Sequence, residues 1–112
     1  MNHTGGYDIE ELTVGMTATF EKTITGEDIL LFADASGDAN PVHVDQQYAL
    51  TKQFGGRIAH GMLTASVISA AIAGRLPGPG TVYLSQNLKF MRPVCPGETV
   101  RATVTVQEVM RE

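Results

Sequence analysis

One apolar segment constrains the fold of this chain more than any other feature. Residues 62–76 place large apolar side chains and alanines on nearly every face of a helix, with no charged residue before Arg75. A helix that is apolar all round is buried in a core instead of lying on a surface. The Pro-Gly repeat at residues 77–80 ends it abruptly. The rest of the chain must therefore supply structure that surrounds this helix.

Three segments predict the strands of a sheet that would do so. Residues 16–24 roughly alternate between apolar and polar side chains, as a strand does. Residues 99–109 alternate valine and alanine against polar side chains, which is typical of a half-buried strand. Residues 81–91 are long enough for a third strand. We therefore predict an α+β fold in which an antiparallel sheet wraps around the central apolar helix.

Shorter helices are expected between the first strand and the apolar helix. Thr25, with Asp28 three residues later, is close to a capping box and predicts a helix start. This helix would end at Ser36-Gly37, and Pro41 would forbid an immediate restart. A short helix over residues 45–52 and a loop over residues 54–57 would follow. Four residues form the expected buried stripe of the first helix: Ile29, Leu30, Phe32 and Ala33.

Composition excludes several classes of partner. The chain has 112 residues, enough for one small domain, and 8 basic against 12 acidic residues give a net charge of −4. Because binding to phosphates needs clustered positive charge, we expect neither nucleic acid nor a membrane surface as a partner. The most apolar stretch is too short to span a bilayer. A lone cysteine, Cys95, and the lack of a signal-peptide pattern indicate the cytoplasm.

The segment Ser36-Gly37-Asp38-Ala39-Asn40-Pro41-Val42-His43 places an acid, an amide and an imidazole in one turn. Asp38 and His43 form the most natural general acid/base pair of the chain, because a carboxylate and an imidazole can share one water molecule. Asn40 could orient either side chain, and Pro41 stiffens the turn. The structural alternative is an Asx-type turn with His43 on the surface.

A second candidate feature precedes the apolar helix. Gly61 opens that helix, where backbone N–H groups lack intrahelical acceptors and the helix dipole favours negative charge. Its N–H, aimed at an enolate-like oxygen, would form an oxyanion hole. The alternative is that Gly61 only starts a tightly packed helix. The neighbouring His60 would either line the site or cap the helix.

The turn resembles the signature of the MaoC-like, (R)-specific enoyl-CoA hydratases. That resemblance implies the hotdog fold and a homodimer whose two sheets join edge to edge. It covers a domain over residues 9–112, which follows a flexible tail over residues 1–8. Members of the family usually continue with further strands, so we expect this domain to be incomplete at its C-terminal end. The matching positions are Phe32, Ser36, Gly37, Asp38, Asn40, Pro41, Val42, His43 and Ala49.

The resemblance also implies a reaction, the reversible syn hydration of a trans-2-enoyl-CoA to the (R)-3-hydroxyacyl-CoA. Asp38 and His43 would activate the water and deliver a proton, and the Gly61 N–H would hold the thioester oxygen. Coenzyme A arrives as part of the acyl-CoA substrate, so we expect no separate cofactor and no metal. Four further residues would contact the substrate, the last two near the acyl pocket: Asn40, His60, Ser69 and Ile72.

Other functions remain open at this point. One is a 3-hydroxyacyl-thioester dehydratase acting on acyl-carrier-protein substrates. Another is a non-catalytic subunit that binds acyl thioesters, which the intact Asp38 and His43 pair disfavours. A metal cluster of Asp38, His43 and Asp45 lacks a second histidine or cysteine at ligand spacing, and His60 could join it only through a tertiary contact.

Overall fold

The computed structural model describes residues 1–111, which divide into two compact units. Unit 1 contains residues 1–21, 66–86 and 101–111, and unit 2 contains residues 22–65 and 87–100. Strands β1 (Thr17–Thr23) and β2 (Thr99–Thr105) and helix α4 (Gly61–Gly74) each contribute residues to both units. In this part of the chain, no helix is both long enough and apolar enough to cross a membrane.

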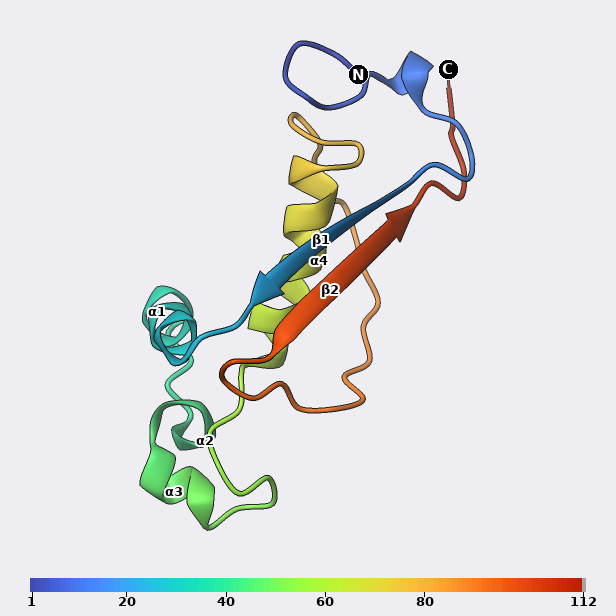
Figure 1. Ribbon diagram of the computed structural model, residues 1–112. Helices are drawn as coiled ribbons and strands as arrows, with labels where there is room; N and C mark the ends of the chain where they lie inside the picture. Colours follow the sequence, from blue (N-terminus) through green and yellow to red (C-terminus); the bar gives the residue numbers. More distant parts are fainter. Residues whose placement is uncertain (112) are drawn as a thin grey trace. The chain divides into compact units, whose positions relative to one another are not determined.

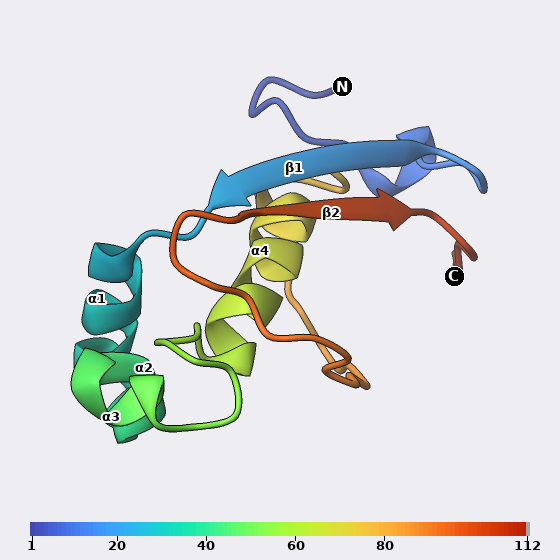
Figure 2. The ribbon, with the colours of Figure 1, turned by 60° about the horizontal axis from the view of Figure 1, so that its bottom comes forward.

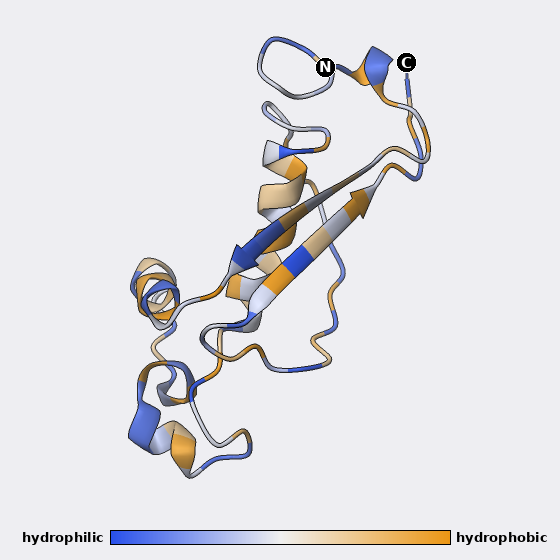
Figure 3. Ribbon diagram, in the orientation of Figure 1, coloured by the Kyte–Doolittle hydropathy of each residue, from blue (hydrophilic) through white to orange (hydrophobic). Residues whose placement is uncertain are grey.

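Strands β1 and β2 pair with each other in one two-stranded sheet (Figure 1). The pairing is antiparallel, because Met16 pairs with Val106 beyond one end and Ile24 with Glu98 beyond the other. Along β2, buried or half-buried apolar side chains alternate with exposed polar ones, and Figure 3 shows this as alternating bands of hydropathy. The predicted alternation is therefore confirmed, although the strand ends at Thr105.

The third predicted strand, over residues 81–91, is wrong. Residues 82–91 have no regular secondary structure, and the sheet of the described residues contains β1 and β2 alone. Val82 and Leu84 are 76% and 90% exposed. A strand needs hydrogen bonds to a neighbouring strand, and no neighbour within residues 1–111 supplies them. Apolar composition and sufficient length alone therefore do not make this segment a strand.

Unit 1 joins the beginning of the chain to the segment that follows α4. Tyr7 donates its backbone N–H to the carbonyl of Pro77 at 2.7 Å, next to the 3₁₀ helix η1 (Ile9–Glu11). The backbones of Gly6 and Gly78 also touch, since a Cβ on Gly78 would lie 2.6 Å from the Gly6 Cα. The predicted flexibility of residues 1–8 stays a prediction.

Helix α4 matches the predicted apolar helix but is not buried on every side. It buries Ala65, Val67 and Ala71, whereas Met62 is 52% exposed and Ser69 is exposed. In both ribbon views the part of α4 in unit 1 runs beside the sheet (Figure 2). With two strands in the described sheet, one side of the helix is buried and the remaining apolar side chains are left partly exposed.

In unit 2, helix α1 (Gly26–Ser36) begins and ends as its local sequence predicts. Asp28 donates its N–H to the Thr25 hydroxyl at 3.0 Å, and Thr25 donates its N–H to the Asp28 carboxylate at 2.9 Å. This bond and the nearby Lys22 ammonium lower the pKa of Asp28. Gly37 ends the helix with a φ of +81°, donating its N–H to Ala33. The predicted capping box is confirmed.

The buried face of α1 is narrower than predicted. Ile29 and Ala33 are buried and Phe32 is half-buried, but Leu30 is 49% exposed. Ile29 and Ala33 are four residues apart and share one face of the helix, whereas Leu30 is turned by about 100° from Ile29. The burial of Leu30 was therefore wrongly predicted.

The chain resumes a helix at once after the turn, contrary to the expectation for Pro41. Helix α2 (Pro41–Val44) has Asn40 as its N-cap, with the side-chain oxygen accepting the N–H of Val42 at 3.2 Å. Proline is well suited to the first helical position, where no intrahelical acceptor exists for an N–H. Helix α3 (Gln46–Leu50) follows, capped by Asp45 and shorter than predicted. Helix α2 packs against both α1 and α3.

Candidate active site

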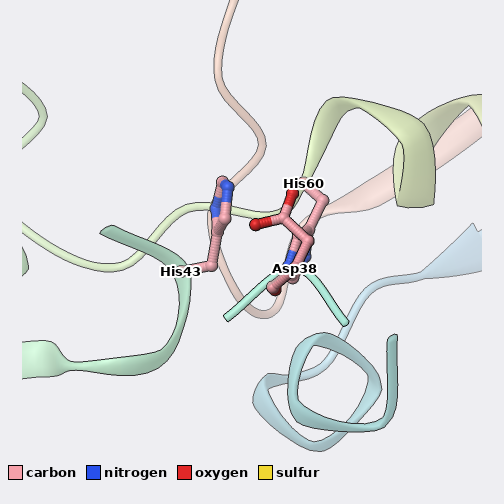
Figure 4. Close-up of side chains that lie close together, drawn as sticks. All are labelled: Asp38, His43 and His60. Atoms are coloured by element: carbon pink, nitrogen blue, oxygen red, sulfur yellow. The ribbon is translucent and has the colours of Figure 1, made fainter. Parts of the chain in front are cut away.

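Three predicted site residues come together in unit 2. Asp38 lies in the turn after α1, His43 lies on α2, and His60 directly precedes α4. One carboxylate oxygen of Asp38 and one ring nitrogen of each histidine all lie within 4.8 Å of one another. Figure 4 shows a carboxylate oxygen of Asp38 directed toward the ring of His43. The structure therefore groups an acid with two imidazoles.

The turn that carries Asp38 is held by local hydrogen bonds. Asp38 donates its N–H to the Ser36 hydroxyl at 3.1 Å, and its Oδ1 accepts the N–H of Asn40 at 3.3 Å. The Asn40 side chain does not bond to Asp38 or His43 but caps α2. Asn40 thus acts on the site through the backbone, by starting the helix that carries His43.

His43 has a defined tautomer. Its Nδ1 lies 2.9 Å from the carbonyl oxygen of Ile58, and because a carbonyl only accepts, this nitrogen carries the hydrogen. In the neutral ring the Nε2 lone pair is then available to take a proton. The backbone of His43 is also fixed, since the Arg57 Nε donates to its carbonyl at 2.6 Å.

Arg57 is a part of this site that the sequence analysis missed. A second nitrogen of the same guanidinium donates to the carbonyl of Gly26 at 3.1 Å, at the start of α1. One side chain therefore ties the first residue of α1 to the residue that carries the imidazole. Arg57 stands in a loop without a recognisable motif, so its role depends on tertiary contacts that no local pattern reveals.

His60 is buried, with 2% of its surface exposed. Its Nε2 donates to the backbone carbonyl of Asp38 at 2.8 Å. Its ring stacks on His43, with centroids 3.9 Å apart and planes 29° apart, and contacts Phe32 at 4.8 Å. A metal ion lies in the plane of each imidazole that binds it, and stacked rings direct their lone pairs side by side. This arrangement therefore suits a metal poorly.

Gly61 is the first residue of α4, and its N–H has no acceptor among residues 1–111. The ring of Phe90 lies against it, because a Cβ on Gly61 would stand 2.9 Å from two of the ring carbons. Glycine is thus required here for close approach. The free N–H at a helix start is a donor for an oxygen that carries negative charge.

A cavity of about 380 Å³ opens beside His43 and Gly61. Its wall combines apolar side chains with one cation, Arg92, and its size suits part of a small organic ligand. The remaining lining residues are Gln53, Phe54, Ile58, Ala59, Thr64, Phe90, Met91, Pro93 and Val94.

Two other predicted substrate contacts belong to unit 1. Ser69 is exposed, and Ile72 lines a separate cavity of about 510 Å³ with Leu76, Pro77 and Val104 among others. Cys95, the only thiol, is not a candidate nucleophile, because desolvation and the neighbouring Glu98 raise its pKa. The structure therefore groups five of the seven predicted site residues in unit 2: Asp38, Asn40, His43, His60 and Gly61.

Known proteins resemble this chain over most of its length. It is 52% identical over 103 residues to the (R)-specific enoyl-CoA hydratase of Rhodospirillum rubrum, covering 92% of this chain and 72% of that protein. It is 47% identical to the 3-hydroxybutyryl-CoA dehydratase of Methylorubrum extorquens, covering 92% of this chain and 66% of that protein. The chain thus spans about two thirds of the length of these relatives.

Solved structures agree with these relatives. The unliganded R-hydratase PhaJ1 of Pseudomonas aeruginosa matches with a TM-score of 0.87 and 51% identity, covering 92% of this chain and 66% of that one. The (R)-hydratase of A. caviae matches with a TM-score of 0.85 and 41% identity, covering 92% and 77%. The predicted α+β hotdog fold is confirmed by these matches. The family model described as "MaoC like domain" matches residues 11–112, and the chain belongs to the MaoC-like dehydratase family.

Proposed function

We propose that this chain catalyses the reversible syn hydration of a trans-2-enoyl-CoA to the (R)-3-hydroxyacyl-CoA, as a hydro-lyase. The observation that carries this proposal is the pair of Asp38 and His43, with a polar atom of each within 4.8 Å of the other. His43 also lines a cavity that reaches the free N–H of Gly61. The names of the relatives from Rhodospirillum rubrum and Methylorubrum extorquens support the same reaction.

The pair supplies the proton transfers of the hydration. A water held between Asp38 and His43 loses a proton to the pair as its oxygen attacks C3, and the pair passes this proton on to C2. Because both groups belong to one cluster, the hydroxyl and the proton add to the same face of the double bond. General acid and base groups of this kind each contribute about 10²–10⁴-fold to a rate.

Gly61 stabilises the charge that develops on the substrate. Attack at C3 moves electrons onto the thioester oxygen, which the N–H of Gly61 would hold at the start of α4. The absence of a side chain on Gly61 leaves room for the ring of Phe90, which lines the same cavity. The thioester would enter the cavity of unit 2, where Arg92 offers a positive charge to the phosphates of coenzyme A.

The remaining parts of the proposal concern contacts and assembly. Asn40, Ser69 and Ile72 stay predicted substrate contacts, whereas the burial of His60 disfavours a direct contact with the substrate. Coenzyme A as part of the substrate makes a separate cofactor or metal unnecessary. A homodimer is supported by the two-stranded sheet, since each strand has an unpaired edge within the described residues. A cytoplasmic location stays a prediction.

A direct assay tests the proposed reaction. Crotonyl-CoA should lose its enoyl absorbance in the presence of the chain, and the product should be oxidised by an (R)-specific, but not an (S)-specific, 3-hydroxyacyl-CoA dehydrogenase. The Asp38→Asn variant serves as the inactive control. Faster turnover of an acyl-carrier-protein thioester would favour the alternative dehydratase. Binding of crotonyl-CoA without turnover by the wild-type chain would indicate a non-catalytic subunit.

A further inference from the structure

We propose that His60 is a positioning residue that holds Asp38 and His43 in the geometry needed for catalysis. The inference rests on the proposed function and deepens it. It assigns to His60 a role that depends on two separate contacts, one made by the ring nitrogen and one by the ring face.

The first contact fixes the turn that presents the carboxylate. Apart from the bond to Ser36 in the same turn, the backbone of Asp38 is held by His60, whose Nε2 donates to its carbonyl at 2.8 Å. The Asp38 side chain is exposed, so packing does not hold it in place. A donor from a buried ring, 22 residues away in the chain, therefore anchors the turn to the start of α4.

The second contact fixes the plane of the other catalytic side chain. The bond from the His43 Nδ1 to Ile58 restrains one edge of the imidazole, and the stacked His60 ring restrains its face. Phe32 supports His60 on another side. With an edge and a face both restrained, the Nε2 of His43 has a defined direction.

The burial of His60 indicates that its imidazole serves these two contacts and does not serve to stabilise the fold. Its Nδ1 is buried without a hydrogen-bond partner in the described part of the chain, which costs free energy. A phenyl ring would fill the same space without that cost. The 2% exposure also leaves little of the ring available to touch a substrate.

Two variants separate the two contacts. His60→Phe keeps a stacking ring and loses the donor, and His60→Gln keeps a donor and loses the ring. We expect each to lower kcat by about 10- to 100-fold while KM changes less than about twofold, because small misplacements of catalytic groups cost rates of this size. In the Asp38→Asn background, where the pair is already broken, His60→Phe should lower kcat little further.

A matched control accounts for simple destabilisation. Ile29 is fully buried in the same unit and does not line the cavity, so Ile29→Val should lower the melting temperature and leave kcat unchanged. Wild-type kcat in folded His60→Phe and His60→Gln would overturn the inference. A raised KM with unchanged kcat would also overturn it, since that result describes a substrate ligand.

A second readout does not depend on activity. In the wild-type chain, ¹⁵N NMR of the imidazoles should show His43 as the single Nδ1–H tautomer. His60→Gln, which loses the stacked ring, should show a mixture, and His60→Phe, which keeps a ring, should show the single tautomer. A single tautomer in both variants counts against positioning, whatever the activity. If the wild-type chain is inactive but His60→Gln changes the tautomer of His43, the proposed reaction is wrong. The positioning of His43 by His60 is then still supported.

Discussion

The segments 36–61 and 82–91 both contain long exposed stretches but are held very differently. In the first, polar side chains bond to backbone groups at Asp38, His43 and Gly26, so even exposed turns have defined conformations. In the second, Leu84 and Met91 are 90% and 74% exposed, and no neighbouring strand pairs with the segment within residues 1–111. The two segments therefore differ in whether hydrogen bonds from side chains or from a neighbouring strand hold their backbone.

The two segments differ in how many hydrogen-bond partners each needs to hold its backbone. Side chains that fix the backbone of a catalytic turn act over short distances, and each needs one donor and one acceptor. A strand needs a whole row of partners before any of its bonds can form. The turns of the unit 2 site are therefore held by local contacts, whereas apolar side chains of 82–91 such as Val82 and Leu84 are left exposed.

The largest expected effect comes from breaking the pair within segment 36–61. Asp38→Asn and His43→Ala should each lower kcat for crotonyl-CoA by about 10³-fold, because each removes one proton-transfer group. The double variant should be hardly slower than either single variant, since both residues act on one water. Single-turnover kinetics with circular dichroism as a folding control measure this. Near wild-type turnover in either folded variant would contradict the proposed chemistry.

A smaller effect is expected from the guanidinium that ties segment 36–61 to α1. Arg57→Ala should lower the free energy of unfolding by about 2 kcal/mol, because it removes two hydrogen bonds from a charged donor. Arg57→Lys should recover only part of this, since an ammonium cannot reproduce the fork of a guanidinium. Urea titration measures both.

The matched control removes an exposed cation from the other segment, 82–91. Lys89 is exposed and makes no ion pair in the described part of the chain, so Lys89→Ala should change the stability little. Equal losses for Arg57→Ala and Lys89→Ala would show that the two bonds of Arg57 do not stabilise the fold.

The smallest perturbation leaves the sequence intact and compares the two segments directly. Limited proteolysis with chymotrypsin should cut first near Tyr83, Leu84 or Phe90, because an unpaired and exposed backbone enters a protease readily. Cuts near Tyr48 or Phe54 should follow later. Mass spectrometry of early time points identifies the order. Early cuts in segment 36–61 would show that its hydrogen bonds do not protect it.

The sequence predicted best the features that depend on neighbouring residues. The capping box of Thr25 and Asp28 and the end of α1 at Gly37 need only a few adjacent residues, and both are confirmed. Pro41 was misjudged although the signal was local, because a proline that breaks a running helix is favourable at the start of a new one.

Features that depend on distant residues were predicted less well. The strand over 81–91 failed because its hydrogen bonds must come from another strand. Arg57 was missed because its two acceptors, on Gly26 and His43, are far from it in the chain. The contacts of His60 likewise become visible only when the turn at Asp38 and the start of α4 are brought together.

The contact between Gly6 and Gly78 has a consequence for which substitutions this chain can accept. Where a side chain lies against a glycine, a second mutation can shorten that side chain and make room for a larger residue. Gly61 is such a case, because the ring of Phe90 lies against it. Backbone atoms oppose Gly6 and Gly78, and Gly78 also has a φ of +94°. No substitution elsewhere removes a backbone, so a second mutation cannot make room for a side chain at either glycine. Sequence drift at these two sites is therefore blocked together, independently of the chemistry that the protein performs.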